Sequence, residues 1–225
     1  MTKRLSRIMV AAYLREIGID YVLVPVRDPR GAEAATLPAR EGEETLEDIR
    51  KEVVACRRCP LCSGRTNVVF GVGNPRARLM FVGEGPGVEE DRQGEPFVGA
   101  AGRLLTKWIQ RIGMVRQDVY IANIVKCRPP GNRAPLPEEA AACLPYLRRQ
   151  IRAIRPEILC TLGAVALNHL LGNNDRITRA RGNWRDLDGI PVLPTYHPAY
   201  ILRNATREHE VLADFDLLAQ RLRSG

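Results

Sequence analysis

The chain has 225 residues, of which 45% are hydrophobic, so it can bury one core and forms one domain or at most two. It contains no run of about 18 apolar residues, which excludes a membrane-spanning helix. The net charge is +8 and all but four of the 34 cations are arginines, which favours partners that carry phosphates or carboxylates, although charge alone indicates only attraction to polyanions.

The first 44 residues are predicted to be an appendage of unknown role. Residues 3–17 have the apolar spacing of a helix, residues 21–26 are typical of a short strand, and residues 27–44 have the composition of a linker. We therefore place the main domain at residues 45–225.

A short apolar stretch near the N-terminus resembles part of a secretion signal. Ile8–Leu14 follows several basic residues, but Arg15 and Glu16 interrupt it and no small-residue cleavage site follows cleanly. We therefore expect a cytoplasmic protein. In that reducing compartment, clustered cysteines are more often metal ligands than disulfides.

Beyond the linker, short apolar runs alternate with amphipathic stretches. The apolar runs are predicted to be strands and lie at residues 78–82, 119–125, 157–162 and 190–195. The amphipathic stretches are predicted to be helices and lie at residues 45–55, 100–112, 137–154, 163–171 and 207–222. This alternation is typical of βαβ units, so the predicted fold class is α/β, a three-layer α/β/α sandwich around a central parallel sheet of about four strands.

Polar residues stand at the carboxyl ends of three predicted strands. Glu84 follows the first strand, Asn123 lies near the end of the second, and His197 follows the fourth. In an open parallel sheet, binding sites form beyond the carboxyl ends of the strands. We therefore expect these three segments to meet in one crevice.

The loop Gly83–Gly87 has the sequence GEGPG, which invites comparison with phosphate-binding loops. Its spacing matches neither the P-loop nor the dinucleotide-binding fingerprint. Two interpretations stay open: a tight turn from strand to helix, or a loop whose backbone lies against a flat ligand because glycine removes the side chain. The acidic run at residues 89–91 is by itself typical of a solvated surface.

Two isolated rings are candidates for the same crevice. Phe97 lies in a loop rich in Gly and Pro, where it is either a core anchor or a stacking platform for a base. A single histidine is more often structural than catalytic, but the position of His197 after a strand favours a role in the site. His169 and His209 lie in predicted helices and are expected to be structural or solvated.

Cysteines suggest a metal centre. Four of them form a plausible set of thiolate ligands, namely Cys56, Cys59, Cys127 and Cys143. Such a set suits zinc or an iron–sulfur cluster, and the spacing does not choose between them. Cys62 is a fifth candidate by position, whereas Cys160 lies inside an apolar strand and is predicted to be a buried, inert thiol.

Six ordered stretches of the chain resemble the family-4 uracil-DNA glycosylases, the iron–sulfur-containing branch of their superfamily. These stretches are CRRCPLCSGRT (56–66), FVGEGPGVEED (81–91), GEPFVGAAGRLL (94–105), NIVKCRPPGNRAPLPEEA (123–140), PEILCTLGAVAL (156–167) and PTYHPAYILRN (194–204). The resemblance covers about residues 45–220, and the first 44 residues have no part in it.

The resemblance implies an N-glycosyl hydrolase that removes uracil from single- or double-stranded DNA and leaves an abasic site. It also implies a structural [4Fe–4S] cluster on Cys56, Cys59, Cys127 and Cys143. Cys62 is left out because the family pattern does not require a cysteine there. The expected location becomes the prokaryotic cytosol or nucleoid, and the protein is expected to act as a monomer with no membrane partner.

The resemblance also implies roles for the crevice residues. A base inside a duplex must be flipped out before it can react. The implied substrate-binding residues are Gly83, Glu84, Gly85, Phe97, Asn123 and His197. Phe97 would stack on the uracil, Asn123 would pair with its N3–H and O4 edge, and His197 would donate to O2 as negative charge develops there. The attacking water needs a carboxylate, and either Glu84 or Glu90 is a candidate.

The resemblance further implies contacts between the protein and the DNA strand around the flipped base. Tyr200, Ile201 and Leu202 are predicted to wedge into the vacated base stack. Arg128, Arg133, Arg203 and the arginines of helix 137–154 are candidates for phosphate contacts.

Two other classes of function remain as alternatives. A damage-recognition module would bind uracil-DNA without turnover or covalently. Relatives that bind covalently carry a histidine after the second strand, and residues 127–137 contain none. A basic iron–sulfur protein that only binds nucleic acid would leave Glu84, Phe97 and His197 without a role.

Overall fold

The computed structural model describes residues 44–224. The helix, strand and linker expected before residue 44 lie outside the described residues, and the domain boundary stays a prediction. Within residues 44–224 no helix is both long and apolar enough to cross a membrane.

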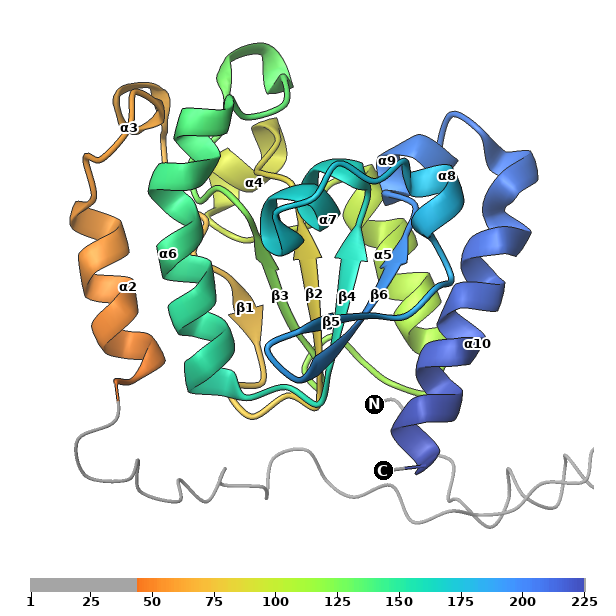
Figure 1. Cartoon of the computed structure of the whole chain (residues 1–225). Coiled ribbons are helices and arrows are strands. Elements are labelled where there is room, and N and C mark those ends of the chain that lie inside the picture. The colour runs from red at the N-terminus through yellow and green to blue at the C-terminus, as the bar shows by residue number, and fades with distance from the viewer. Residues whose placement is uncertain (1–43, 225) are drawn as a thin grey trace, which may run out of the picture. The chain divides into compact units, whose positions relative to one another are not determined.

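The centre of the fold is a six-stranded sheet with the order β1-β3-β2-β4-β6-β5 (Figure 1). Its four inner strands are parallel and match the four predicted runs, namely β2 (Leu79–Gly83), β3 (Tyr120–Asn123), β4 (Ile158–Leu162) and β6 (Ile190–Thr195). The edges are antiparallel strands β1 (Val72–Gly73) and β5 (Arg185–Leu187), which the prediction of about four strands omitted. Two- and three-residue strands are too short to show a hydrophobic pattern.

Helices cover both faces of the sheet, which confirms the three-layer α/β/α sandwich (Figure 1). One face packs against α2 (Leu46–Ala55), α6 (Pro137–Ile154) and α7 (Ala164–Leu171). The other packs against α5 (Ala100–Arg111) and α10 (Glu208–Ser224). Four short helices lie in the connections, namely α3 (Leu61–Gly64), α4 (Val88–Gln93), α8 (Ile177–Ala180) and α9 (Pro198–Ile201), together with 3₁₀ turns at Pro130–Asn132 and Ala205–Arg207.

The long helices begin and end at residues with recognisable caps. Thr45 and Asp48 form a capping box at the start of α2. Helix α6 starts with Pro137 at its first position and ends at Arg155, which is left-handed at φ 53°. Its bounds are those that the sequence predicted, because both termini carry strong local signals.

An aromatic cluster ties α5 and α10 to the sheet. The rings of Phe81 and Phe215 stack with centroids 5.7 Å apart, and Trp108 contacts Phe215 at 5.6 Å. Full burial of each such side chain contributes about 1.5–3 kcal/mol. This packing fixes the sheet whose carboxyl edge carries the polar residues.

Candidate active site

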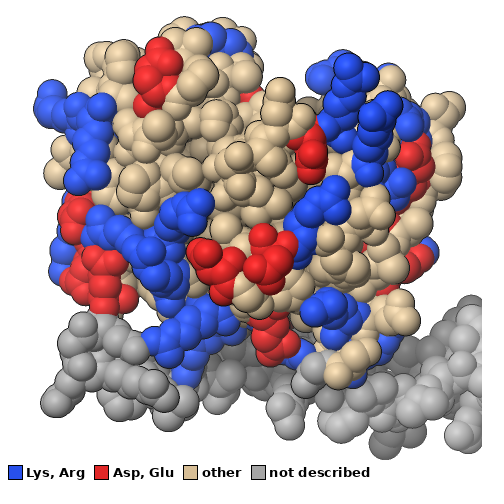
Figure 2. Space-filling model, in the orientation of Figure 1, with Lys and Arg blue, Asp and Glu red and all other residues tan. Residues whose placement is uncertain are grey.

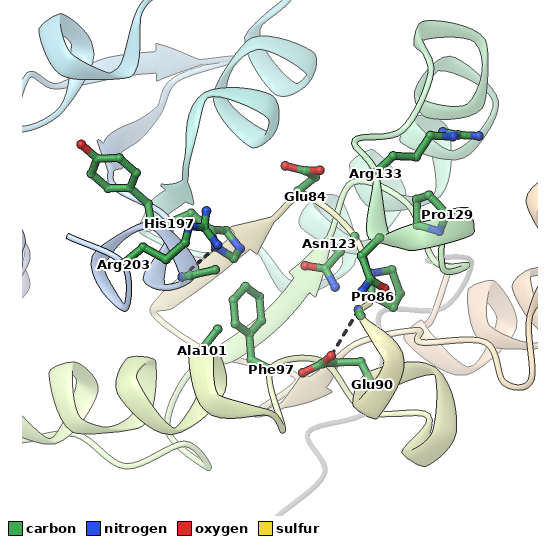
Figure 3. Close-up of a pocket in the computed structure, with 15 residues that line it drawn as sticks. Glu84, Pro86, Glu90, Phe97, Ala101, Asn123, Pro129, Arg133, His197 and Arg203 are labelled. Atoms are coloured by element: carbon green, nitrogen blue, oxygen red, sulfur yellow. Dashed lines mark hydrogen bonds between the residues drawn. The ribbon is translucent and has the colours of Figure 1, made fainter. Parts of the chain in front are cut away.

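A cavity of about 510 Å³ opens beyond the carboxyl ends of the parallel strands (Figure 3). Its walls come from the segments expected to meet there, since Glu84, Asn123 and His197 all line it. Phe97, Glu90 and Arg203 add to the polar and aromatic lining. The volume lies within the range of small-molecule sites.

The end of strand β2 forms the base of the cavity. Gly83 is buried beneath the side chains of Asn123 and Phe97, and an added methyl group would overlap the Asn123 oxygen and lie 2.6 Å from Phe97 Cζ. Gly85 and Pro86 continue along the wall. The glycine at position 83 is therefore needed so that the ring and the amide can reach the same space.

Phe97 is held in an uncommon conformation next to this base. Its φ is +55°, a left-handed value that costs about 1–3 kcal/mol for a residue with a side chain. Helix α5 packs directly against its backbone, where a methyl group on Gly102 would overlap the Phe97 carbonyl. The ring is 7% exposed and its centroid lies 5.6 Å from that of His197. Phe97 is therefore held in a strained backbone conformation that places its ring at the cavity.

His197 presents one defined ring nitrogen to the cavity. Its Nδ1 accepts a hydrogen bond from the backbone N–H of Ala199 at 3.1 Å and caps helix α9, so the proton of the neutral ring lies on Nε2. Burial, and then the nearby Arg203, lower the pKa of His197 to about 4, with Glu90 acting in the opposite direction. At neutral pH the ring is an uncharged N–H donor.

Asn123 contributes a buried amide with an open hydrogen-bonding position. The residue is 1% exposed, and its Oδ1 has no hydrogen-bond partner within residues 44–224. A buried polar atom left unpaired costs about 1–3 kcal/mol. An unpaired acceptor beside Phe97 and His197 is suited to a ligand that brings an N–H donor.

The two candidate carboxylates occupy different environments (Figure 3). Glu90 accepts backbone N–H groups from Gly87, Val98 and Gly99 at 3.2, 2.9 and 3.0 Å, so it joins the two loops that form the cavity wall. The carboxylate of Glu84 has no hydrogen-bond donor in the described part of the chain, and burial raises its pKa above 4.5. Within residues 44–224, the Glu84 carboxylate is thus the one of the two whose acceptor positions are all open to a water molecule.

The three predicted wedge residues separate in the structure. Leu202 is 50% exposed next to the cavity, whereas Ile201 is 2% exposed and packs in the core. In this conformation α9 turns the Ile201 side chain inward, so of the two apolar side chains Leu202 is the one exposed to a DNA strand. Tyr200 lines the cavity, and its hydroxyl accepts from Arg207 at 3.2 Å.

The predicted phosphate contacts also differ. Arg203 lines the cavity, and no hydrogen bond or ion pair occupies its guanidinium within residues 44–224. Arg133 also lines the cavity, but its guanidinium forms a two-pronged ion pair with Glu139, both bonds being 2.8 Å. Arg128 donates to Asn132 at 2.7 Å. Among these three, Arg203 lines the cavity without a carboxylate partner in the described residues, while Arg128 is held only by a neutral amide.

Cations lie in several groups on the surface, one of them at the upper right of Figure 2, around α8 to α10. The arginines of α6 differ in their partners and in their position along the helix. Arg149 is bound by Glu44 and Glu52, while Arg152 stands in the last turn of α6, and that end of the helix lies away from the arrowheads of the parallel strands (Figure 1).

Some lining residues were not predicted from the sequence. These are Pro86, Gly87, Ala101, Pro129, Asn132 and Ala199. Pro86 and Gly87 lie inside the GEGPG loop and could have been included with its other residues. Small residues such as Ala101 cannot be recognised as site residues from the sequence, because their contribution is to leave space in the cavity.

The cysteines gather at a second, smaller cavity on the α2–α6 side of the sheet. It is lined by the four predicted ligands, by Cys62, and by Arg65 and Lys126. Arg65 donates to the sulfur of Cys127 at 3.3 Å. Burial raises the pKa of Cys127 and raises that of Cys143 to about 11, so these thiols need a cation to become thiolates.

Within residues 44–224, no three His, Cys, Asp or Glu side chains are grouped closely enough to share one metal ion. An iron–sulfur cluster needs no such convergence, since each of its irons binds its own thiolate. The N–H donor at Cys127 is of the kind that stabilises cluster sulfurs. Cys160 is fully buried in β4, away from this cavity.

Comparisons with known proteins point to one family. Residues 70–222 match the model of the uracil DNA glycosylase superfamily. The chain is 52% identical over 168 residues to the type-4 uracil-DNA glycosylase of Thermotoga maritima, covering 74% of this chain and 88% of the relative. It is 44% identical over 185 residues to the type-4 enzyme of Archaeoglobus fulgidus, covering 79% and 93%. For the type-4 enzyme of Sulfurisphaera tokodaii the identity is 48% over 181 residues, covering 76% and 82%.

Proposed function

Because the chain belongs to the uracil DNA glycosylase superfamily, we propose that it excises uracil from DNA by hydrolysing the N-glycosidic bond. The observation that carries the proposal is the cavity in which the Phe97 ring, the unpaired oxygen of Asn123 and the neutral His197 converge. These three groups match a flat base that has an N–H donor on one edge and a carbonyl on the other.

The first step is extrusion of the base from the stack, at a cost of a few kcal/mol. Phe97 stacks on the flipped uracil, and Asn123 Oδ1 accepts the N3–H. The amide nitrogen faces O4, and this pattern distinguishes uracil from cytosine. Leu202, exposed at the cavity rim, fills the gap left in the strand.

Hydrolysis then breaks the bond between C1′ and N1. The bonding electrons leave with the uracil, and the His197 Nε2–H donates to O2, where the negative charge gathers. The oxygen of a water molecule bonds to C1′, and Glu84 orients this water and takes up its proton. Glu90 keeps the two wall loops in place through its backbone hydrogen bonds.

Uracil excision should depend on pH through Glu84. The raised pKa means that Glu84 becomes protonated as pH falls, so the single-turnover rate should rise with pH through this pKa and then level off. His197 stays neutral across this range because its pKa is about 4. Glu84→Gln should be slow and should lose this limb of the profile. Glu90→Gln should instead lower the unfolding temperature and keep the limb. An unchanged profile in Glu84→Gln would assign the pH dependence to another group.

We further propose a [4Fe–4S] cluster on Cys56, Cys59, Cys127 and Cys143. Their shared cavity and the Arg65 hydrogen bond to Cys127 support it. Cys56 and Cys59 lie near the start of the domain, Cys127 in the β3–α6 loop and Cys143 in α6, so these residues would hold a bound cluster between those segments. The hydrolysis itself transfers no electrons, so the role of the cluster is structural.

Iron analysis tests the ligand set. Purified protein should be brown and contain about four irons per chain. Cys127→Ser or Cys143→Ser should lose iron and destabilise the fold, because the remaining thiolates cannot hold the cluster. Cys62→Ser is the matched control and should keep its iron although Cys62 lines the same cavity. Stoichiometric zinc without iron in anaerobically prepared protein would contradict the cluster.

DNA binding should depend on salt. If arginines neutralise phosphates, the logarithm of the affinity should fall linearly with the logarithm of salt concentration, with a slope of about −0.9 per phosphate for duplex DNA. Arg203→Ala should make that slope shallower. Arg111→Ala, which removes a charge paired with Asp216, should leave it unchanged. A salt-independent affinity would exclude the electrostatic contribution.

Uracil-containing DNA, single- or double-stranded, is thus the proposed partner, and the cytosol or nucleoid of a prokaryotic cell is the proposed location. A monomer suffices for the chemistry, since all of the proposed site residues come from one chain.

A direct test of the function uses a labelled oligonucleotide with one uracil. Incubation followed by alkali should break the strand at that position, because an abasic site is alkali-labile. The same oligonucleotide with thymine should stay intact. An intact uracil strand would contradict the proposed activity.

A further inference from the structure

Lys126 is a buried cation for which the proposed chemistry gives no role. It lies in the loop between Asn123 and Cys127, and it is 1% exposed. Its Nζ donates to the backbone carbonyl of Asn123 at 2.9 Å and to Oε1 of Gln150 at 2.6 Å. Gln150 is fully buried on α6, and its Nε2 donates to the carbonyl of Phe70 at 3.0 Å. The ammonium is therefore held in one place.

Both acceptors of this ammonium are neutral. No carboxylate forms an ion pair with Lys126 in the described part of the chain. A buried ammonium without a negative partner costs several kcal/mol, on the order of the penalty for an unpaired buried ion. A negative charge nearby in the interior would offset this cost.

The cysteine cavity can supply that charge. Lys126 lines it together with the four proposed ligands. A [4Fe–4S] core held by four thiolates carries a net negative charge, because the thiolates outweigh the charge of the core. Lys126 lies where it can compensate this charge from the interior, as Arg65 does beside Cys127.

The same side chain reaches the segment that carries the base-reading amide. Asn123 ends strand β3, and the next two residues continue the pairing with the GEGPG loop: Ile124 N–H donates to Gly83 and Val125 N–H to Glu84, at 2.9 and 3.2 Å. The Lys126 hydrogen bond to the Asn123 carbonyl fixes the peptide at the point where the strand becomes this loop. A shift there would move the Asn123 side chain relative to Phe97.

We propose that Lys126 is a positioning residue that couples the charge of the cysteine-held cluster to the placement of Asn123. The inference rests on the proposed function of both cavities. It makes two separable predictions, one about the cluster and one about uracil recognition.

Lys126→Met removes the charge and the side-chain hydrogen bonds of Lys126 and keeps a side chain of similar length. The variant should keep its iron and its circular dichroism spectrum, because no cluster ligand is changed. The reduction potential of its cluster should shift to a more negative value, since a nearby positive charge favours the added electron. Single-turnover excision of uracil should slow by about 10- to 100-fold, the usual effect of losing a supporting contact. Affinity for DNA without uracil should stay unchanged.

Lys107→Met is the matched control, because Lys107 is exposed on α5, on the other face of the sheet. It should change neither the potential nor the rate. If Lys126→Met does not fold, Lys126→Gln replaces it; its amide is also uncharged but can hydrogen-bond the Asn123 carbonyl. It should shift the potential and lose less activity.

An unchanged potential in the variant that folds overturns the charge part of the proposal, and an unchanged excision rate overturns the positioning part. If neither variant retains iron, Lys126 is a cluster-binding requirement and the positioning proposal is wrong. Failure of wild-type protein to release uracil counts against the proposed function instead, while the potential still tests the charge of Lys126.

Discussion

Replacing His197 with alanine should lower the single-turnover rate of uracil excision by about 10²–10³-fold, the usual effect of removing one donor to a developing anion. The structure gives the reason. The Ala199 N–H fixes the proton on Nε2, and the lowered pKa keeps the ring neutral, so a single N–H is preorganised for uracil O2. Affinity for uracil-DNA should change much less, because the charge on O2 develops only in the transition state.

His197 also caps helix α9, so the alanine variant removes two interactions. His197→Asn separates them, because asparagine is a good N-cap but lacks the Nε2–H. It should be as slow as His197→Ala and more stable to heat. His209→Ala, on the exposed face of α10, should behave as wild type. Equal losses of binding and rate in His197→Ala would assign this residue to architecture rather than chemistry.

Asn123→Asp should lose most of the excision of uracil and gain at most a trace on cytosine. Uracil offers N3–H as a donor and O4 as an acceptor, and one amide satisfies both. An ionised carboxylate has no donor for O4, and each unpaired buried group costs about 1–3 kcal/mol, which corresponds to about 5- to 150-fold in rate. Cytosine has an N4–H₂ group that can donate a hydrogen bond to the carboxylate.

Single-turnover cleavage of matched single strands with uracil or cytosine measures this preference without base-pair opening. Asn132→Asp is the control, since Asn132 lines the same cavity and belongs to no proposed catalytic group. It should retain wild-type preference. An unchanged rate and preference in Asn123→Asp would show that another residue reads the base.

The sequence predicted the parts of the fold that have strong local signals. Helix α6 has a proline at its start and acidic residues in its first turn, and its bounds were correct. The inner strands were long apolar runs, so their order along the chain and parallel pairing followed. The edge strands β1 and β5 form through tertiary pairing with β3 and β6, and their own two or three residues carry no pattern.

For the site too, the sequence predicted what strand order determines and missed what packing determines. The convergence of Glu84, Asn123 and His197 followed from strand topology. Distinguishing Glu84 from Glu90 needed the backbone contacts of Glu90, which join segments that are separate in the sequence. The inward turn of Ile201 and the ion pair of Arg133 with Glu139 likewise arise from packing. No motif distinguishes an exposed arginine from one that a buried carboxylate holds.

The most direct test of hydrolytic turnover measures the amount of free uracil released. Wild-type protein is incubated with an excess of uracil-containing single-stranded DNA, and released uracil is measured by mass spectrometry against the protein concentration. A hydrolytic glycosylase should release more than one uracil per chain, and denaturing gels should show no protein–DNA adduct. No free uracil, or one equivalent accompanied by a covalent adduct, would contradict turnover and favour a damage-binding module.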